Sequence, residues 1–230
     1  MSLKDRFILN FVAEDRWQYL VNGLKVTLIV AFFAALLGIV IGFVLAIIRA
    51  THDKEGKLNI LNLIAHLYIT VIRGTPVVVQ LLIIYFVVFA SVNVSKVLVA
   101  VLAFGMNSGA YVAEIFRSGI MSIDNGQFEA GRSIGMTYIQ TMRHIIVPQA
   151  FKNVLPALGN EFIVLLKETS IAGYISIQDL TKAGDLIRFA TFEAFIPLIT
   201  VALIYLVMVL GLSKLLSIFE RRLAKSDNRH

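Results

Sequence analysis

Apolar residues run along this chain in five long stretches that are separated by short charged segments. A helix needs about 20 apolar residues to cross the ~30 Å hydrocarbon core of a bilayer, and each stretch is long enough. The pattern therefore predicts an all-α integral membrane protein in which residues 1–230 form a single transmembrane domain. We expect the spans at about 20–48, 58–90, 95–120, 145–167 and 193–220.

Two of these stretches are interrupted by polar residues. The second is too long for one straight helix and contains the sequence Arg73-Gly74-Thr75-Pro76, which predicts a break. Polar residues recur at helical spacing between 59 and 70, so we expect an amphipathic lead-in before the break and an inserted part, 76–90, after it. Lys152, Pro156 and Glu161 all fall inside the fourth stretch, which makes it the least apolar of the five.

Composition agrees with a membrane protein. Hydrophobic residues make up 58% of the chain, charged residues only 16%, and the mean hydropathy is +0.81. No cysteine is present, which excludes disulfides and thiolate metal sites, and the four histidines have no metal-like spacing. The net charge of +6 does not indicate nucleic-acid binding, because no basic patch interleaved with aromatic residues accompanies it. The first 20 residues lack the features of a secretory signal peptide, so we expect the first span to direct insertion.

The basic residues predict an orientation. They cluster between spans one and two, between spans three and four, and after span five, and these three segments share one side of the membrane. The positive-inside rule makes that side cytoplasmic. We therefore expect an N-terminus outside and a cytoplasmic C-terminus.

The cytoplasmic segment 124–147 predicts two short helices joined by a tight turn. Asp124, followed three residues later by Gln127, indicates a capping box at the start of the first helix. Gly135 stands where that helix needs a left-handed residue to end, and a second helix begins near Thr137. Pro148 suits the first turn of the following span.

One face of the first short helix has almost no side chain. Ala130 and Gly131 would let a partner approach closely, and Glu129 and Arg132 flank them with opposite charges. By itself this pattern is equally typical of an ordinary helix pair at the membrane surface.

The residues Glu129, Ala130, Gly131 and Gly135, closed by Pro148, resemble the EAA signature of permease subunits in binding-protein-dependent ABC importers. The segments 72–80, 109–120 and 147–170 are similar to the polar amino acid branch of that superfamily (histidine, arginine or glutamine type), and the resemblance covers roughly residues 20–222. Two positions depart from the signature: Gly131 replaces an alanine, and Ile134 stands where leucine is common.

The resemblance implies a type I ABC importer permease in a bacterial cytoplasmic membrane. In that family the short helix is the coupling helix, which docks on the ATP-hydrolysing subunit, so Glu129, Ala130, Gly131, Arg132 and Gly135 become the expected coupling residues. It also implies two ABC ATPase subunits, a second permease copy or paralogue and an extracytoplasmic solute-binding protein as partners, besides the lipid bilayer and the amino acid substrate. Gly56-Lys57 is the only Gly-Lys pair and lacks the rest of a P-loop, so ATP and magnesium belong to the partner and this chain is expected to be neither an enzyme nor a cofactor carrier.

Polar residues inside the spans are candidates for substrate contact, because they are costly to bury there. Glu161 stands alone in an apolar stretch and needs either a protein cation or a cationic ligand, such as a basic amino acid. Asn160, Asn107, Ser108 and Tyr111 are the other candidates. Each also has a structural reading: Glu161 could pair with Arg73, and the small residues of the third span could serve helix packing.

Two other classes of protein compete with the importer subunit. A channel or secondary carrier would not need the segment 124–147. An intramembrane enzyme would need a nucleophile and base or paired metal ligands at membrane depth, and the sequence contains no HExxH motif.

Overall fold

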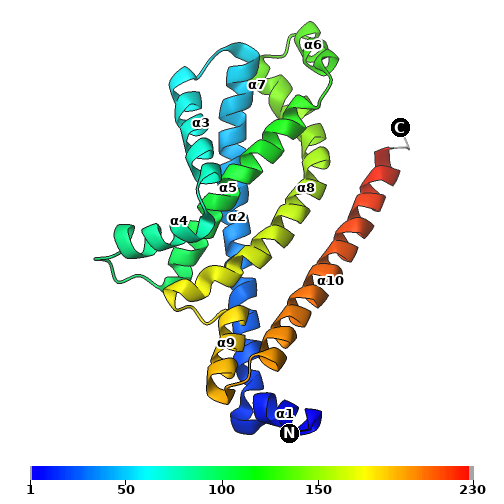
Figure 1. Ribbon diagram of the computed structural model, residues 1–230. Helices are drawn as coiled ribbons and strands as arrows, with labels where there is room; N and C mark the ends of the chain where they lie inside the picture. Colours follow the sequence, from blue (N-terminus) through cyan, green and yellow to red (C-terminus); the bar gives the residue numbers. More distant parts are fainter. Residues whose placement is uncertain (1, 228–230) are drawn as a thin grey trace.

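The computed structural model describes residues 2–227, with side chains described from 2 to 223, and the regular elements in that range are all helices (Figure 1). This confirms the predicted all-α fold. In chain order the elements are α1 (Leu3–Phe7), η1 (Ile8–Val12), η2 (Ala13–Asp15), α2 (Trp17–Glu55), α3 (Asn59–Gly74), α4 (Val77–Ile83), η3 (Ile84–Val88), α5 (Lys96–Met121), α6 (Asn125–Ser133), α7 (Tyr138–Thr141), η4 (Met142–Ile146), α8 (Val147–Glu168), η5 (Thr169–Ile175), α9 (Leu180–Thr191) and α10 (Phe195–Asp227).

Three helices of the described range are long and apolar enough to cross a membrane, namely α2, α5 and residues 195–223 of α10. The pair formed by α3 and the segment 77–88 makes a fourth candidate. Helix α8 corresponds to the predicted span 145–167 and packs between α5 and α10, but polar positions such as Lys152 and Glu161 lower its hydropathy. Its crossing of the membrane stays a prediction.

The predicted break in the second span is present and sharp. Thr75 and Pro76 have extended backbone conformations, and the helices on either side differ in direction by 108°. Proline disfavours the helical conformation of the residue before it, which explains why α3 ends at Gly74. Helix α3 runs beside α2 and α5, whereas α4 crosses the long axis of the molecule (Figure 1).

The centre of the fold is the contact between α2 and α5, where each helix carries two glycines four residues apart. A Cβ atom on Gly42 would lie 2.5 Å from Val112 Cγ1, and one on Gly105 would lie 2.7 Å from Leu37 Cδ2. Small residues at this spacing let two membrane helices approach backbone to backbone, which favours van der Waals packing. The remaining helices are arranged around this pair.

The N-terminal segment formed by α1 and η1 is fixed against the turn that joins α9 to α10. The fully buried Asn10 donates from its amide to Glu193 Oε2 at 2.7 Å and accepts from Thr191 Oγ1 at 2.9 Å. Arg6 forms an ion pair with Glu193. The N-terminal segment therefore lies at the end of the molecule opposite α6 and α7 (Figure 1).

Candidate functional site

The segment 124–147 folds as the sequence predicts, with two short helices and a tight turn. Gly135 has φ +82°, a conformation that side chains other than glycine rarely adopt. Its N–H donates to Arg132 O at 2.9 Å and the N–H of Met136 donates to Gly131 O at 3.0 Å. This pair of hydrogen bonds is the Schellman motif, so Gly135 sets the angle between α6 and the chain that follows it.

The capping box lies on the second helix and not on the first. The Asp124 carboxylate accepts from the N–H of Gly126 at 2.7 Å, and no reciprocal bond from Gln127 closes a box there. Thr137 and Gln140 form the box at the start of α7. The prediction for Asp124 and Gln127 was therefore wrong in its pairing, although Asp124 is the N-cap residue.

The small face of α6 divides between two surroundings. Gly131 is buried against α7, where a Cβ atom would lie 2.6 Å from Thr141 Oγ1. The expected close approach at Gly131 is therefore made by the chain's own second helix. Ala130 and Glu129 are exposed, and so is Arg132, whose side chain is 71% accessible. These three residues form the exposed surface of α6, and from it Arg132 reaches Glu55 of α2 at 3.4 Å.

The structure brings together two of the five predicted substrate contacts. Ser108 Oγ on α5 donates to Glu161 Oε1 on α8 at 2.9 Å. Both residues line a cavity of about 280 Å³, otherwise walled by apolar side chains of α2, α5 and α8: Phe32, Ala35, Leu36, Ile39, Val112, Leu158 and Phe162. No ion pair to Glu161 is found within the described part of the chain, so the structure supplies a hydroxyl and no cation to this carboxylate.

The other three candidates face different surroundings. Asn107 is buried and donates to Gln80 Oε1 at 2.9 Å. Gln80 in turn donates to Ile72 O and to Thr75 Oγ1, at 2.7 and 2.8 Å, and so braces the break between α3 and α4. Gln80 is not among the predicted site residues, although it ends the segment 72–80. Nothing along the chain shows that the residues at the break fold back onto the Gln80 side chain.

Tyr111 and Asn160 contact other groups. The Arg73 guanidinium stands over the Tyr111 ring at 5.2 Å from its centroid, a cation–π contact that gives Arg73 a neighbour other than Glu161. Asn160 is exposed and donates to Pro156 O at 3.2 Å on its own helix. Substrate contact by Asn107, Tyr111 and Asn160 stays a prediction.

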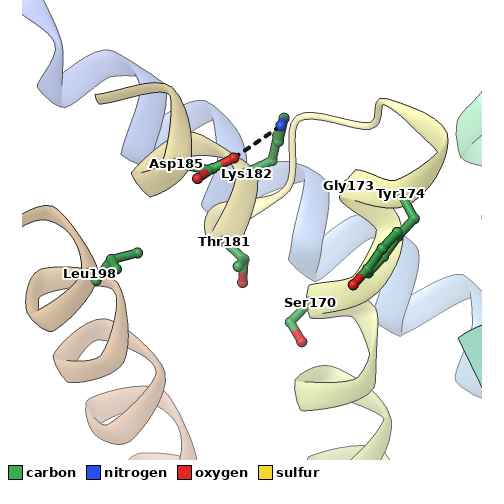
Figure 2. Close-up of a pocket in the computed structure, with 7 residues that line it drawn as sticks. All are labelled: Ser170, Gly173, Tyr174, Thr181, Lys182, Asp185 and Leu198. Atoms are coloured by element: carbon green, nitrogen blue, oxygen red, sulfur yellow. Dashed lines mark hydrogen bonds and ion pairs between the residues drawn. The ribbon is translucent and has the colours of Figure 1, made fainter. Parts of the chain in front are cut away.

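A second cavity, of about 270 Å³, lies at the other end of α8. Figure 2 shows the hydroxyl groups of Ser170, Thr181 and Tyr174 around one space, with Leu198 of α10 opposite and the ion pair of Lys182 and Asp185, at 3.1 Å, beside it. A neighbouring cavity shares Ser170, Thr181 and Leu198 and extends to Lys167 and Tyr205. None of the residues that line these two cavities is among the predicted site residues.

The start of α9 is held by a buried carboxylate. Asp179 is 1% exposed and accepts from the N–H groups of Thr181 and Lys182, at 3.1 and 3.2 Å. Burial raises the pKa of Asp179 to about 6, since the charged form loses its water, although these hydrogen bonds act in the opposite direction. The region between spans four and five therefore contains a group that titrates close to neutral pH.

The structure is thus a helical domain with a glycine-terminated short helix at one end and cavities beside its apolar helices. The chain belongs to the family of binding-protein-dependent transport system inner membrane components, whose model matches residues 38–225. This confirms the family that the EAA signature predicts, and with it that the chain is a transport subunit and not an enzyme.

Relatives and a solved structure agree over nearly the whole chain. A proposed glutamine transport system permease protein, GlnP, of Rickettsia typhi is 38% identical over 207 residues, which are 89% of this chain and 93% of the relative. Arginine transport system permease protein ArtQ of Bacillus subtilis is 37% identical over 211 residues, 91% of this chain and 94% of ArtQ. A crystal structure of an amino acid ABC transporter with histidines matches with a TM-score of 0.82 and 45% identity, covering 92% of this chain and 98% of the other. This likeness confirms the type I importer permease fold.

Proposed function

We propose that this chain forms the translocation path of an ATP-driven importer for polar amino acids, basic ones in particular. The relatives named above carry the substrates glutamine and arginine in their names, and the matching crystal structure contains histidines. The observation that carries the proposal is the Glu161 carboxylate, which lies half-buried in an apolar cavity with only Ser108 as its partner. A cationic side chain in that cavity would offset the desolvation of the carboxylate by charge-assisted hydrogen bonds.

The coupling helix α6 docks on a separate ATPase subunit, which holds the ATP and magnesium. Its exposed surface allows close approach at the small side chain of Ala130. Glu129 supplies a negative charge and Arg132 a positive charge beside it. Gly131 and Gly135 shape the element from behind, one through its contact with Thr141 and the other through its left-handed backbone. A short helix fixed at both ends passes on a rigid-body motion without unfolding.

The whole importer contains two permease chains, identical or paralogous, with two ATPase subunits and a solute-binding protein. The chain lies in a bacterial cytoplasmic membrane with α6 and the C-terminus on the cytoplasmic side and the N-terminal segment outside. The clustered basic residues support this orientation, as does the position of α1 at the end opposite α6 (Figure 1). The binding protein would then approach the end that carries α1 and α9.

Uptake of radiolabelled amino acids into proteoliposomes tests the proposal. We expect accumulation of arginine, lysine or histidine that requires the ATPase subunits, the binding protein and internal ATP. Flux that persists without ATP and without the partners would contradict the proposal and favour a channel or secondary carrier. The native chain has no cysteine, so a cysteine placed at Thr51 should label only from the cytoplasmic side, and reversed labelling would overturn the orientation.

A further inference from the structure

The last turn of α2 holds the coupling helix through charged groups. Lys54 Nζ donates to Asn125 Oδ1 at 2.6 Å and stands over the Phe128 ring at 4.8 Å from its centroid. Glu55, whose side chain is only 12% exposed, accepts from Arg132 at 3.4 Å. We call these contacts of Lys54 and Glu55 with α6 the inner clasp.

The same turn of α2 is tied to α5. Asp53 accepts from Arg117 Nε at 2.9 Å, and Arg49 forms an ion pair with Glu114. The inner end of α2 is therefore bound to the coupling helix and to α5 together. A displacement of α6 reaches α2 directly, before it passes through the turn at Gly135 and the rest of the loop.

The outer end of α2 is joined to α9. The buried N–H of Leu180 donates to Thr27 Oγ1 at 3.1 Å, and a Cβ atom on Gly23 would lie 2.7 Å from Asp179 O. Helix α9 supplies Thr181, Lys182 and Asp185 to the outer cavity in Figure 2. Any axial or tilting motion of α2 is therefore imposed on one wall of that cavity.

Both joints belong to α2, which is one unbroken α-helix of 39 residues. At 1.5 Å per residue it is about 58 Å long. It contains no proline, which is a common cause of sharp kinks in helices. The helix is therefore stiff enough to carry a displacement from one end to the other.

We propose that α2 is a lever that transmits the movement of the coupling helix to the outer cavity, and that Lys54 and Glu55 are positioning residues for transport. The proposal rests on the docking of α6 on an ATPase subunit. It differs from a purely local role of the turn at Gly135, because it assigns the transmission to contacts between α2 and α6 that the loop does not make.

Removal of the inner clasp tests the lever in the reconstituted complex of permease, ATPase and binding protein. Lys54→Ala combined with Glu55→Gln should lower the stimulation of ATP hydrolysis by loaded binding protein roughly fivefold, as expected when a cation–π contact and hydrogen bonds to charged groups are lost together. Copurification of the ATPase subunits checks that the complex still assembles. Lys57→Ala is the matched control for loss of a basic side chain at this end of α2, since Lys57 is 70% exposed and its ion pair with Glu55 involves no residue of α6.

A reversible cross-link gives the sharper test. In Lys54→Cys with Asn125→Cys, made with cysteine-free partners, the Lys54 part of the clasp is absent while Glu55 keeps its contact with Arg132, so uptake should fall, but less than in the first variant. Bridging the two thiols with a short reagent that reduction removes should restore uptake, because α2 and α6 move as one body. Uptake that stays low or is abolished when the bridge forms would overturn the lever, and so would parental stimulation in the variant without the clasp.

The two proposals fail in different ways. If Gly135→Val abolishes coupling while the clasp variants behave as the parent, α6 couples to the ATPase but α2 is no lever. If neither change affects stimulation, the coupling role of α6 fails as well.

Discussion

The pair α2 and α5 and the flank formed by α8 and α10 are built in opposite ways. Most of the apolar part of α5 is buried in the chain, whereas little of α10 is. Gly42 brings the backbone of α2 against the β-branched Val112 and against the amide nitrogen of Ala113. Between α8 and α10, by contrast, Gly159 meets only the tip of Leu216, beside a cavity of about 330 Å³.

The α2–α5 pair is therefore a rigid unit, and the α8–α10 flank is a looser one. A close-packed interface between glycines and stiff side chains changes shape only at a large cost, because no neighbour can yield. A flank with cavities and flexible leucine tips can shift at low cost. The polar site formed by Ser108 and Glu161 lies where these two parts meet, so relative movement of α8 against α5 would open or close it.

The largest effect is expected from alanine at the glycines of the two parts. Gly42→Ala places a Cβ 2.5 Å from Val112 Cγ1 and 2.8 Å from Ala113 N, so we expect destabilisation by about 3 kcal/mol and little folded protein. Gly159→Ala should be nearly neutral, since the atoms nearest its Cβ all belong to the end of the flexible Leu216 side chain, 2.4 Å away at Cδ1, which can shift toward a cavity. Thermal melting of purified protein measures both.

A third substitution is the control for helix propensity. Gly211→Ala on α10 meets nothing within 4 Å and should be neutral or slightly stabilising. Equal losses of melting temperature for Gly42→Ala and Gly159→Ala would show that the α2–α5 pair and the α8–α10 flank are packed equally tightly, which would contradict the difference described above.

The second-largest effect is expected at Glu161, which lies between the α2–α5 pair and the α8–α10 flank. Glu161→Gln keeps the shape and the hydrogen bond with Ser108 but removes the charge. Affinity for arginine should fall by at least about 2 kcal/mol, because a buried charge pair costs roughly 2–5 kcal/mol to break. Uptake of neutral amino acids, where it occurs, should be nearly unchanged. Competition against radiolabelled arginine in the reconstituted complex measures the difference.

Glu168→Gln is the matched control, as a carboxylate on the same helix two turns farther on. We expect it to leave the preference for basic over neutral substrates as it is. Equal loss for all substrates in Glu161→Gln, or unchanged arginine binding, would show that Glu161 only holds α8 to α5.

A smaller effect is expected at Gly135, in the turn that follows α6. Gly135→Val forces a β-branched residue into a left-handed conformation, at a cost of about 1–2 kcal/mol, and should misalign α6. The protein should still insert, but stimulation of ATP hydrolysis by loaded binding protein should be lost. Gly135→Asn is the control, since asparagine tolerates this conformation; near-normal uptake by Gly135→Val would remove the basis for a rigid coupling element.

The coupling segment could be predicted almost completely because its signals are local. Asp124, Gly135 and Thr137 each act through hydrogen bonds within a few residues, and the structure places all three at helix ends as expected. The surroundings of Gly131 could not be predicted in the same way. Its neighbour Thr141 lies on the next helix, and only the folded turn shows that the small face is covered from within.

The polar centre was less predictable, because contacts there join distant parts of the chain. The hydrogen bond between Ser108 and Glu161 crosses 53 positions, and that between Asn107 and Gln80 crosses 27. Periodicity tells which residues are buried but not which helix lies opposite. The sharp bend after Gly74 decides the second pair, since it turns α4 toward α5.

The smallest effect is a pH dependence at the outer joint of α2 with α9. Because the pKa of Asp179 is about 6 in the folded chain against an ordinary value of 3.8, the folded state binds more protons than the unfolded state between these values. Stability therefore falls as pH rises, by about 1 kcal/mol between pH 5 and pH 7, and is constant above that range. For a chain of this size the melting temperature should drop by about 2–4 °C.

Asp179→Asn should abolish this slope while it keeps the helix start intact. Asparagine is as good an N-cap as aspartate, and its single side-chain oxygen can still accept from one of the two N–H groups, of Thr181 and Lys182, that Asp179 binds through separate oxygens. The variant should melt at the same temperature at pH 5 and pH 7, after correction for the slope that other groups contribute, and above the parent at pH 7. Gly173 of η5 lies beside the Asp179 carboxylate, since a Cβ atom on this glycine would lie 3.4 Å from Asp179 Oδ1, and Tyr205 of α10 is an ionisable group that interacts with the Asp179 charge. If parent and variant show the same slope, the pH dependence arises elsewhere and α9 is joined to α2 by a group that does not titrate in this range.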